Sequence, residues 1–196
     1  VFAFALNIVQ AQEIKPAEVN EVMKQVADWQ IEHFNESCSG HKNPHHQLDW
    51  TNAALYVGMV KWAAMANDNS YYKWLQKIGD DNGWLLHKRK YHADDHAVGQ
   101  MYIELYRKFN DEKMIEPTKD HFDFIMYHPS QSVLNWETPF HQDRWNWCDA
   151  LFMSPPVWAK LYNITGEQKY LDFMMDEYKA TTEFLFDKKE HLYYRD

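Results

Sequence analysis

Apolar residues recur every three or four positions along most of the chain, which is the spacing of one face of an α-helix. In residues 16–34 this spacing joins Val22, Val26 and Trp29, and Pro16 suits the first turn of a helix. The same spacing predicts helices over residues 51–66, 70–78, 95–109, 111–127, 156–163 and 167–186. No convincing alternation of apolar and polar residues indicates a β-strand. The pattern therefore predicts an all-α protein.

Three segments share a plan in which one helix ends, a short polar turn follows and a second helix begins. They cover residues 61–75, 104–118 and 160–174. The predicted helix stops in them are Asn67, Asn110 and Gly166, residue types that adopt the left-handed conformation common at helix ends. The plan predicts αα-hairpins stacked in series.

Longer connections, rich in aromatic and polar residues, separate these hairpins. They cover residues 35–50, 80–94 and 128–148. In a toroid of helical hairpins, loops of this kind gather on one face. Loops held by a rigid scaffold often carry binding and catalytic residues, so we expect the functional site in these three loops.

The composition narrows the class of partner. Hydrophobic residues make up 45% of the chain and aromatic residues 16%, which indicates a folded core and excludes a disordered chain. The formal net charge of −9 argues against nucleic acid and anionic membrane surfaces, because both need a basic face. After the N-terminal segment no stretch is long and apolar enough to span a membrane. Aromatic rings suit carbohydrate binding, although most of them are expected to lie in the core.

The first residues, VFAFALNIVQAQ, are apolar and end in a small-x-small pattern before Gln12. This pattern predicts that residues 1–11 are the remnant of a secretory signal peptide, with a buried first strand or helix as the alternative. A signal peptide predicts an exported protein, either periplasmic or secreted. Residues 12–196 are then expected to form part of one domain and to be a monomer. The two cysteines, Cys38 and Cys148, are too few for a disulfide framework.

The first loop contains three histidines close together, which raises the question of a metal. His41, His45 and His46 match no strong metal-ligand spacing. We therefore expect no metal and no cofactor at this loop.

The second loop leads into a helix through two adjacent carboxylates, Asp94 and Asp95. Aspartate is a favoured helix N-cap, and only one of the two can fill that position. The other is free to face the loop, next to His92 and His96. Adjacent like charges make it easier for one carboxyl to keep its proton. The pair is therefore a candidate for acid–base chemistry.

The third loop ends in RWNWCDALFM, residues 144–153, in which Asp149 lies among large apolar side chains. A carboxylate that loses water needs a partner or a role. Ser154 and Pro155 already supply an N-cap and first-turn signal for the following helix, so that helix does not need Asp149. A cap of a short turn over residues 150–153 is still open to it.

The aromatic neighbours of this aspartate suggest a chemical role. Trp145, Trp147 and Phe152 are expected to desolvate Asp149 and to raise its pKa, as a general acid requires. The structural alternative is a buried Asp149 satisfied by backbone N–H groups. Two carboxyl centres on the loop face of a helical toroid suggest glycoside chemistry without identifying the reaction.

Two blocks of sequence, ADDHAVGQMYIELY and WNWCDALFMSPPVWAKLYNITGEQKYL, resemble a known family. They are similar to glycoside hydrolase family 105, the unsaturated rhamnogalacturonyl and glucuronyl hydrolases, with family 88 as its relative. The resemblance implies an (α/α)6 barrel of six helical hairpins. It also implies that roughly the N-terminal half of the barrel is present and that the chain looks truncated at both ends. Such a piece is expected to expose apolar surface and to lack part of its pocket, so it could be inactive.

The resemblance implies an unusual reaction on an oligosaccharide that carries an unsaturated uronate. An aspartic acid protonates C4 of the C4=C5 enol ether, and water, deprotonated by the same group, adds at C5. The resulting hemiketal opens and the aglycone leaves. The anomeric carbon is never attacked, so the usual distance between two carboxylates need not apply, and one general acid/base suffices.

The resemblance also implies roles for individual residues. Asp149 is the expected acid/base, and one of Asp94 and Asp95 is the second carboxylate, with a preference for Asp94 because Asp95 can serve as the N-cap. The residues expected to line the sugar site or to contact the sugar are Trp50, His96, His141, Arg144, Trp145, Trp147 and Met153.

Two other functions fit the same residues. One is an inverting (α/α)6 glycosidase that acts on saturated glycosides, which needs a base carboxylate across the pocket from Asp149. The other is a carbohydrate-binding protein with the same aromatic pocket and no turnover. Loss of the ultraviolet absorbance of an unsaturated uronyl sugar distinguishes hydration from both alternatives.

Overall fold

The computed structural model describes residues 15–37, 42–135 and 142–195, and these are mostly helical, as the sequence predicts. The helices are α1 (Pro16–Glu32), α2 (Trp50–Met65), α3 (Asn69–Asp81), α4 (Ala93–His96), α5 (Gly99–Phe109), the 3-10 turn η1 (Glu112–Met114), α6 (Glu116–Tyr127), α7 (Ala150–Met153), α8 (Pro155–Thr165) and α9 (Gln168–Leu185). The predicted signal-peptide remnant lies outside the described residues. No helix in the described ranges has the length and apolar character needed to cross a membrane.

The chain divides into two compact units, residues 1–35 and residues 36–196. The described part of the first unit is built around α1, which starts at Pro16 as predicted. Within α1, Lys24 donates a hydrogen bond to Asp28 one turn later, and such pairs support an isolated helix.

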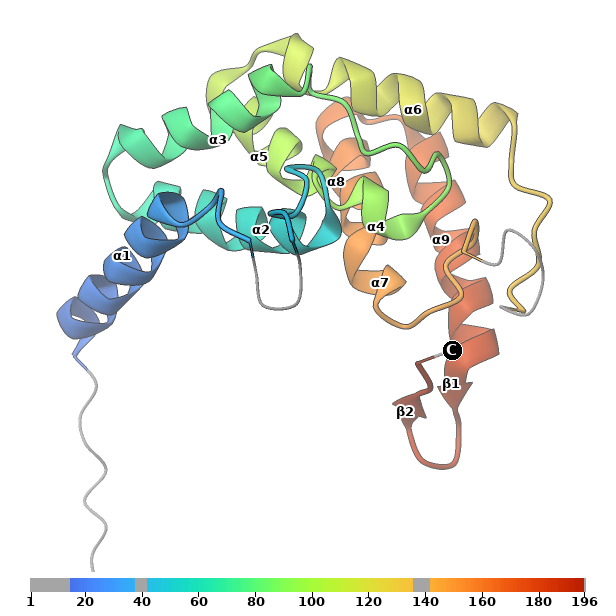
Figure 1. The fold of residues 1–196 in the computed structure, drawn as a ribbon. Helices are drawn as coiled ribbons and strands as arrows, with labels where there is room; N and C mark the ends of the chain where they lie inside the picture. Colours follow the sequence, from blue (N-terminus) through green and yellow to red (C-terminus); the bar gives the residue numbers. More distant parts are fainter. Residues whose placement is uncertain (1–14, 38–41, 136–141, 196) are drawn as a thin grey trace, which may run out of the picture. The chain divides into compact units, whose positions relative to one another are not determined.

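The second unit is a series of packed helical hairpins. Helix α2 packs on α3, and α8 packs on α9, while α5 lies against both α2 and α8 (Figure 1). Its largest fully buried side chains are aromatic and include Trp158, Tyr56, Tyr102, Tyr170 and Phe122. The rings of Phe122 on α6 and Trp158 on α8 stack with their centroids 3.7 Å apart. The predicted hairpin architecture is therefore present, and its core is built around large aromatic side chains.

The predicted helix stops are confirmed by the backbone. Asn67, Asn110 and Gly166 all have positive φ angles of 51°, 54° and 71°. The last two are the C-cap residues of α5 and α8. An asparagine or glycine tolerates this left-handed conformation with little strain, so it can end a helix and reverse the chain.

The structure differs from the predicted pattern at three places. The helix expected over residues 95–109 is divided into α4 and α5, and the one expected over 111–127 starts as η1 before α6. After α9 the chain forms a two-residue antiparallel hairpin of β1 (Phe186–Asp187) and β2 (Leu192–Tyr193), which was not expected. Periodicity missed these details because segments of two to four residues are too short to establish a period.

Glycine permits the close approach of α5 to the start of α8. A Cβ added at Gly99 would lie 2.7 Å from Cγ1 of Val157 and 3.2 Å from Cδ2 of Leu86. Val157 is fully buried and branched, so it has little freedom to move away. Close packing at this point also fixes α4, which immediately precedes α5 in the chain.

Two buried histidines donate hydrogen bonds to the same backbone carbonyl, which lies in the loop before α4. The Nε2 atoms of His96 and His121 donate to the carbonyl oxygen of Lys90 at 3.0 Å and 2.7 Å. The Nδ1 atom of His96 accepts from the Ser154 hydroxyl at 2.7 Å, and Ser154 Oγ accepts from the Trp158 indole N–H at 3.1 Å. The network requires a neutral His96 ring, because each of its nitrogens has a single complementary partner.

Burial lowers the pKa of His96 to about 3 and is also the main reason that the pKa of His121 falls to about 4. The neighbouring imidazole of His121 adds to the effect on His96. Both values lie below the ordinary histidine pKa of about 6.5. The unfolded chain therefore binds protons that the folded chain does not, and stability falls as the pH is lowered through 6.5.

Gly99→Ala tests the approach of α5 to α8. We expect the free energy of unfolding to fall by about 1–3 kcal/mol, because the added methyl group overlaps Val157. Gly58→Ala is the matched control, since a Cβ there meets nothing within 4 Å and alanine favours an α-helix. Urea unfolding measures both variants. An unchanged midpoint for Gly99→Ala would contradict this packing.

The histidine pair predicts a steep loss of stability in mild acid. Between pH 6.5 and pH 5 each histidine is expected to remove about 1.4 kcal/mol per pH unit from the free energy of unfolding. His121→Gln keeps an amide donor without a titrating ring, so the slope of stability against pH should fall by about half over this range. Urea midpoints measured at several pH values give the slopes, with His128→Gln at an exposed position as the control. Equal slopes for the wild type and His121→Gln would refute the prediction.

Candidate functional site

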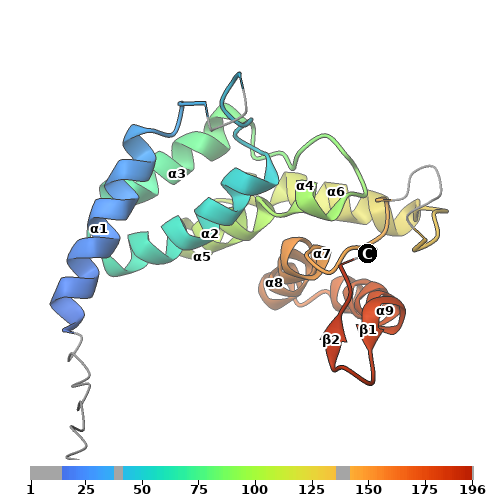
Figure 2. The same ribbon diagram turned by 60° about the horizontal axis from the view of Figure 1, so that its bottom comes forward.

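Two short helices bring the second and third loops together. Helix α4 packs against α7, and they lie next to each other in both views (Figures 1 and 2). His92 precedes α4 as its N-cap, and its Nδ1 accepts the backbone N–H of Asp94 at 3.2 Å. Asp149 precedes α7 in the corresponding position. The predicted Asp94 and Asp149 therefore start two adjacent helices.

A shallow, open hollow lies at the start of these two helices, and it is called the carboxyl hollow below. It is lined by His92, Ala93, Asp94, Gln142, Arg144, Asn146, Trp147, Asp149 and Ala150. Four of the predicted site residues, two carboxylates, one arginine and one tryptophan, thus share one small space. The loop hypothesis correctly placed these candidates together.

Asp94 is a carboxyl at this hollow whose pKa is raised by its surroundings. Its side chain is 18% exposed, and burial raises its pKa. His92 and Arg89 oppose the rise, while the negative charge of Asp149 adds to it and that of Asp95 adds less. Asp94 is therefore expected to keep its proton to higher pH than an ordinary aspartate, and burial is the main cause.

Asp149 is exposed, and the expectation that aromatic residues bury it is wrong. Trp145 lies beneath the surface at 3% exposure, where its carbonyl accepts the Thr181 hydroxyl. Phe152 is itself 49% exposed. The Asp149 carboxylate makes no capping hydrogen bond to α7, so the structural role left open for it is not used. Its carboxylate is accessible from the hollow.

Asp95 is held in a structural role, although not the predicted one. Its side chain is 1% exposed and accepts three hydrogen bonds from Arg89, from the backbone N–H, Nε and Nη2. The N-cap of α4 is His92, so the expectation that Asp95 caps this helix is wrong. The preference for Asp94 over Asp95 as the second carboxylate stays a prediction, now motivated by the hollow that Asp94 lines and Asp95 does not.

Arg144 lines the hollow with its charge already paired. Its Nε and Nη2 atoms donate to the two carboxylate oxygens of Glu177 on α9 at 2.9 Å and 2.8 Å. No sequence pattern pointed to Glu177, because it lies on a regular helix far from the loops. A partner from another hairpin is visible only once the tertiary structure is known.

The end of the chain also reaches this region through the β1–β2 hairpin. The Arg195 guanidinium lies 5.0 Å from the centroid of the Trp147 ring, and the Arg195 carbonyl accepts the backbone N–H of Cys148 at 2.9 Å. The Trp147 Nε1 atom is buried without a hydrogen-bond partner among the described residues. Arg195 was not expected here, since the hairpin that returns it to this loop was not predicted.

The remaining predicted contacts are more dispersed. Trp50 is the first residue of α2 and is 47% exposed, Met153 is buried on α7, and His96 is 1% exposed with both ring nitrogens engaged. None of these three lines the carboxyl hollow. His141 lies outside the described residues. Their sugar contacts stay predictions.

The first loop has its own polar cluster. Nδ1 of His45 and Nε2 of His87 lie 3.6 Å and 3.3 Å from the two carboxylate oxygens of Asp49, and the His46 ring stacks on His87. Among the residues whose positions are described, no three His, Cys, Asp or Glu side chains form a group that could hold a metal ion. The cluster therefore ties the loop before α2 to the loop after α3.

Comparison with known proteins finds family 88, which the sequence analysis named as the relative of family 105. Residues 22–196 match the model of Glycosyl Hydrolase Family 88. A relative from Alteromonas sp. (strain LOR), named an unsaturated 3S-rhamnoglycuronyl hydrolase, is 32% identical over 87% of this chain and 45% of its own length. A relative of the same name from Formosa agariphila is 30% identical over 99% of this chain and 51% of its own length. The chain thus spans about half the length of these curated relatives.

A solved structure supports the fold independently of close sequence similarity. A protein titled a possible member of GH105 family, from Klebsiella pneumoniae subsp. pneumoniae, has a TM-score of 0.72 and 12% identity. The likeness covers 100% of this chain and 56% of the Klebsiella chain. The predicted fold class is confirmed, since the hairpins correspond to about half of an (α/α)6 barrel. With the match over residues 22–196, these findings show that the chain belongs to glycosyl hydrolase family 88.

Proposed function

We propose that the protein is a glycoside hydrolase that acts on unsaturated uronyl oligosaccharides by hydrating the C4=C5 double bond. The pairing of Asp94 and Asp149 at one hollow carries this proposal, because hydration of an enol ether needs a carboxyl that keeps a proton and can release it. Two relatives at about a third identity are named unsaturated 3S-rhamnoglycuronyl hydrolases, which supports the same substrate class.

The proposed reaction needs one proton donor and one water. Asp149, which is exposed toward the hollow, donates its proton to C4 and then accepts a proton from the water that adds at C5. The hemiketal formed at C5 opens to a ketone, which leaves C1 as a hemiacetal. This hemiacetal expels the next sugar as an alcohol. Asp94 supports the step as the second carboxyl at the hollow, because burial and the charge of Asp149 raise its pKa and help it to keep a proton.

The hollow also offers a surface for the ring of the sugar. Trp147 lines it, and its indole provides an apolar face of the kind on which sugar C–H groups pack. Arg144 and His92 supply polar groups on the same wall. We propose that these three residues orient the uronate while the carboxyl pair performs the proton transfer.

Asp149→Asn tests the role of the acid. We expect the variant to lose at least about a hundredfold in kcat/KM on an unsaturated uronyl disaccharide, because the amide cannot donate and recover a proton. The assay follows loss of the ultraviolet absorbance of the conjugated double bond. Asp176→Asn, an exposed aspartate on α9, is the matched control.

Three outcomes of that assay have different meanings. Loss of absorbance by the wild type and not by Asp149→Asn supports hydration. Release of reducing sugar from saturated substrates, with the absorbance intact, would instead identify an ordinary inverting glycosidase. Sugar binding without any turnover would identify a carbohydrate-binding protein. Measured on the full-length protein, either of the last two results rejects the proposed function.

Two variants, Asp94→Asn and Asp95→Asn, test which of these carboxylates takes part in the reaction and which one stabilises the fold. Asp94→Asn should abolish turnover with a change in the free energy of unfolding of less than about 1 kcal/mol, because it also removes repulsion from Asp149. Asp95→Asn should lower that free energy by about 1.5–3 kcal/mol, since it weakens three hydrogen bonds from Arg89. Urea unfolding and the absorbance assay are measured on both variants. The reverse pattern would assign the second carboxylate to Asp95.

A further inference from the structure

The Arg144–Glu177 pair joins the third loop to α9 across the edge of the carboxyl hollow. The two side chains are 27% and 19% exposed, so water screens them only in part. The pair has two parallel N–H···O bonds, which fix the plane of the guanidinium as well as its position. A single loop arginine would otherwise sample many rotamers.

The pair leaves part of Arg144 available. A guanidinium has five N–H donors, and the bonds to Glu177 use one on Nε and one on Nη2. Three donors are not engaged by Glu177. Because Arg144 lines the hollow while Glu177 does not, the carboxylate of Glu177 fixes the arginine without occupying the space a ligand would enter.

The charges around the hollow are balanced in pairs. The charged and titratable groups that face it, or pair with a group near it, are Arg89, His92, Asp94, Asp95, Arg144, Asp149, Glu177 and Arg195. Arg89 is bound to Asp95, and Arg144 is bound to Glu177. If Glu177 were neutral, an uncompensated arginine would line the same hollow as the two carboxyls and would favour their ionised forms.

We propose that Glu177 is a positioning residue of this site: it holds Arg144 so that its remaining donors meet the carboxylate of a bound uronyl group, and it cancels the arginine charge at the hollow that Asp94 also lines. This role rests on the proposed function for its ligand. The charge balance itself is a property of the protein without substrate.

Glu177→Gln tests both parts. The amide removes the charge and keeps one acceptor, so we expect KM for an unsaturated uronyl disaccharide to rise about tenfold while kcat at the optimal pH changes less than about twofold. In the substrate-free protein, a carboxyl NMR titration with labelled aspartate should show the pKa of Asp94 lowered by about half a unit or more, because the charge of Arg144 is no longer cancelled. The pH dependence of turnover should shift to lower pH by a similar amount.

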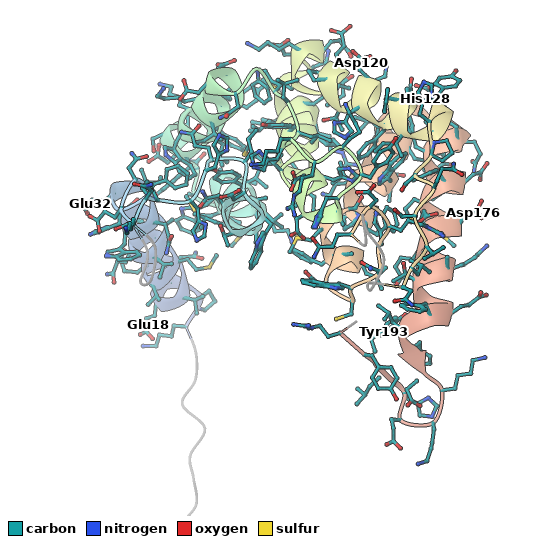
Figure 3. All side chains as sticks on the ribbon, turned by 45° about the vertical axis from the view of Figure 1, so that its right-hand side comes forward. Glu18, Glu32, Asp120, His128, Asp176 and Tyr193 are labelled. Carbon is teal, nitrogen blue, oxygen red and sulfur yellow. The ribbon has the colours of Figure 1, made fainter. Side chains whose placement is uncertain are left out.

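Two further variants distinguish a positioning role of Glu177 from a contribution to the stability of the fold alone. Glu177→Asp keeps the charge, so it should retain the wild-type carboxyl titration even if its shorter side chain raises KM. Asp176→Asn removes the same charge at the preceding residue of α9, where the side chain is exposed (Figure 3), and should leave KM and the titration unchanged. A melting temperature recorded for each variant identifies loss of folding.

The results distinguish this role from the reaction itself. Wild-type KM and wild-type titration in Glu177→Gln, whatever its melting temperature, would overturn the positioning role while the proposed function stands. A wild type that leaves the double bond intact would reject the proposed function. In that case the substrate-free titration alone tests the charge-balancing part of the proposal. An unchanged pKa of Asp94 in Glu177→Gln would reject that part.

Discussion

A hydrogen bond between two buried side chains, His96 and Ser154, connects the two halves of the carboxyl hollow. His96 ends α4, and Ser154 follows α7 and begins the entry to α8, so the bond fixes one short helix relative to the other. The same hydroxyl accepts from the indole of Trp158, which stacks on Phe122 in the core. The distance between the candidate carboxyls is therefore set by the most tightly packed part of the protein and not by the loops that carry them.

The hollow shows how a protein can keep two carboxylates close without neutralising both. Arg89 and Arg144 are each engaged by another acid, Asp95 and Glu177. Paired charges act on a third group as dipoles, and their influence falls steeply with distance. Burial then raises the pKa of Asp94, the charge of Asp149 adds to the rise, and His92 and Arg89 oppose it.

The sequence predicted those features of the fold that depend on the backbone preference of a residue or on its neighbours in the chain. The positive φ angles of Asn67, Asn110 and Gly166 follow from residue type alone, and helical spacing located the long helices to within a few residues. The grouping of Asp94 with Asp149 was also predictable, because loops of successive hairpins meet on one face of a toroid. These features depend on short-range chemistry or on simple topology.

Contacts between distant segments could not be predicted in the same way. Nothing near Glu177 in the sequence indicates that it will meet Arg144, and His92 took the N-cap position expected for Asp95. Asp149 looked buried because its neighbours in sequence are aromatic, but side chains at successive positions of a turn point in different directions. Trp145 turns into the core while Asp149 faces solvent.

The return of the chain end to the third loop has a consequence for how the site forms. The carbonyl of Arg195 binds the N–H of Cys148, and the loop that contains Cys148 is also held by Thr181 of α9 through the Trp145 carbonyl. The loop that carries Asp149 is thus held from two further places, α9 and the residue at the end of the β1–β2 hairpin, so loosening either contact would loosen the wall of the hollow.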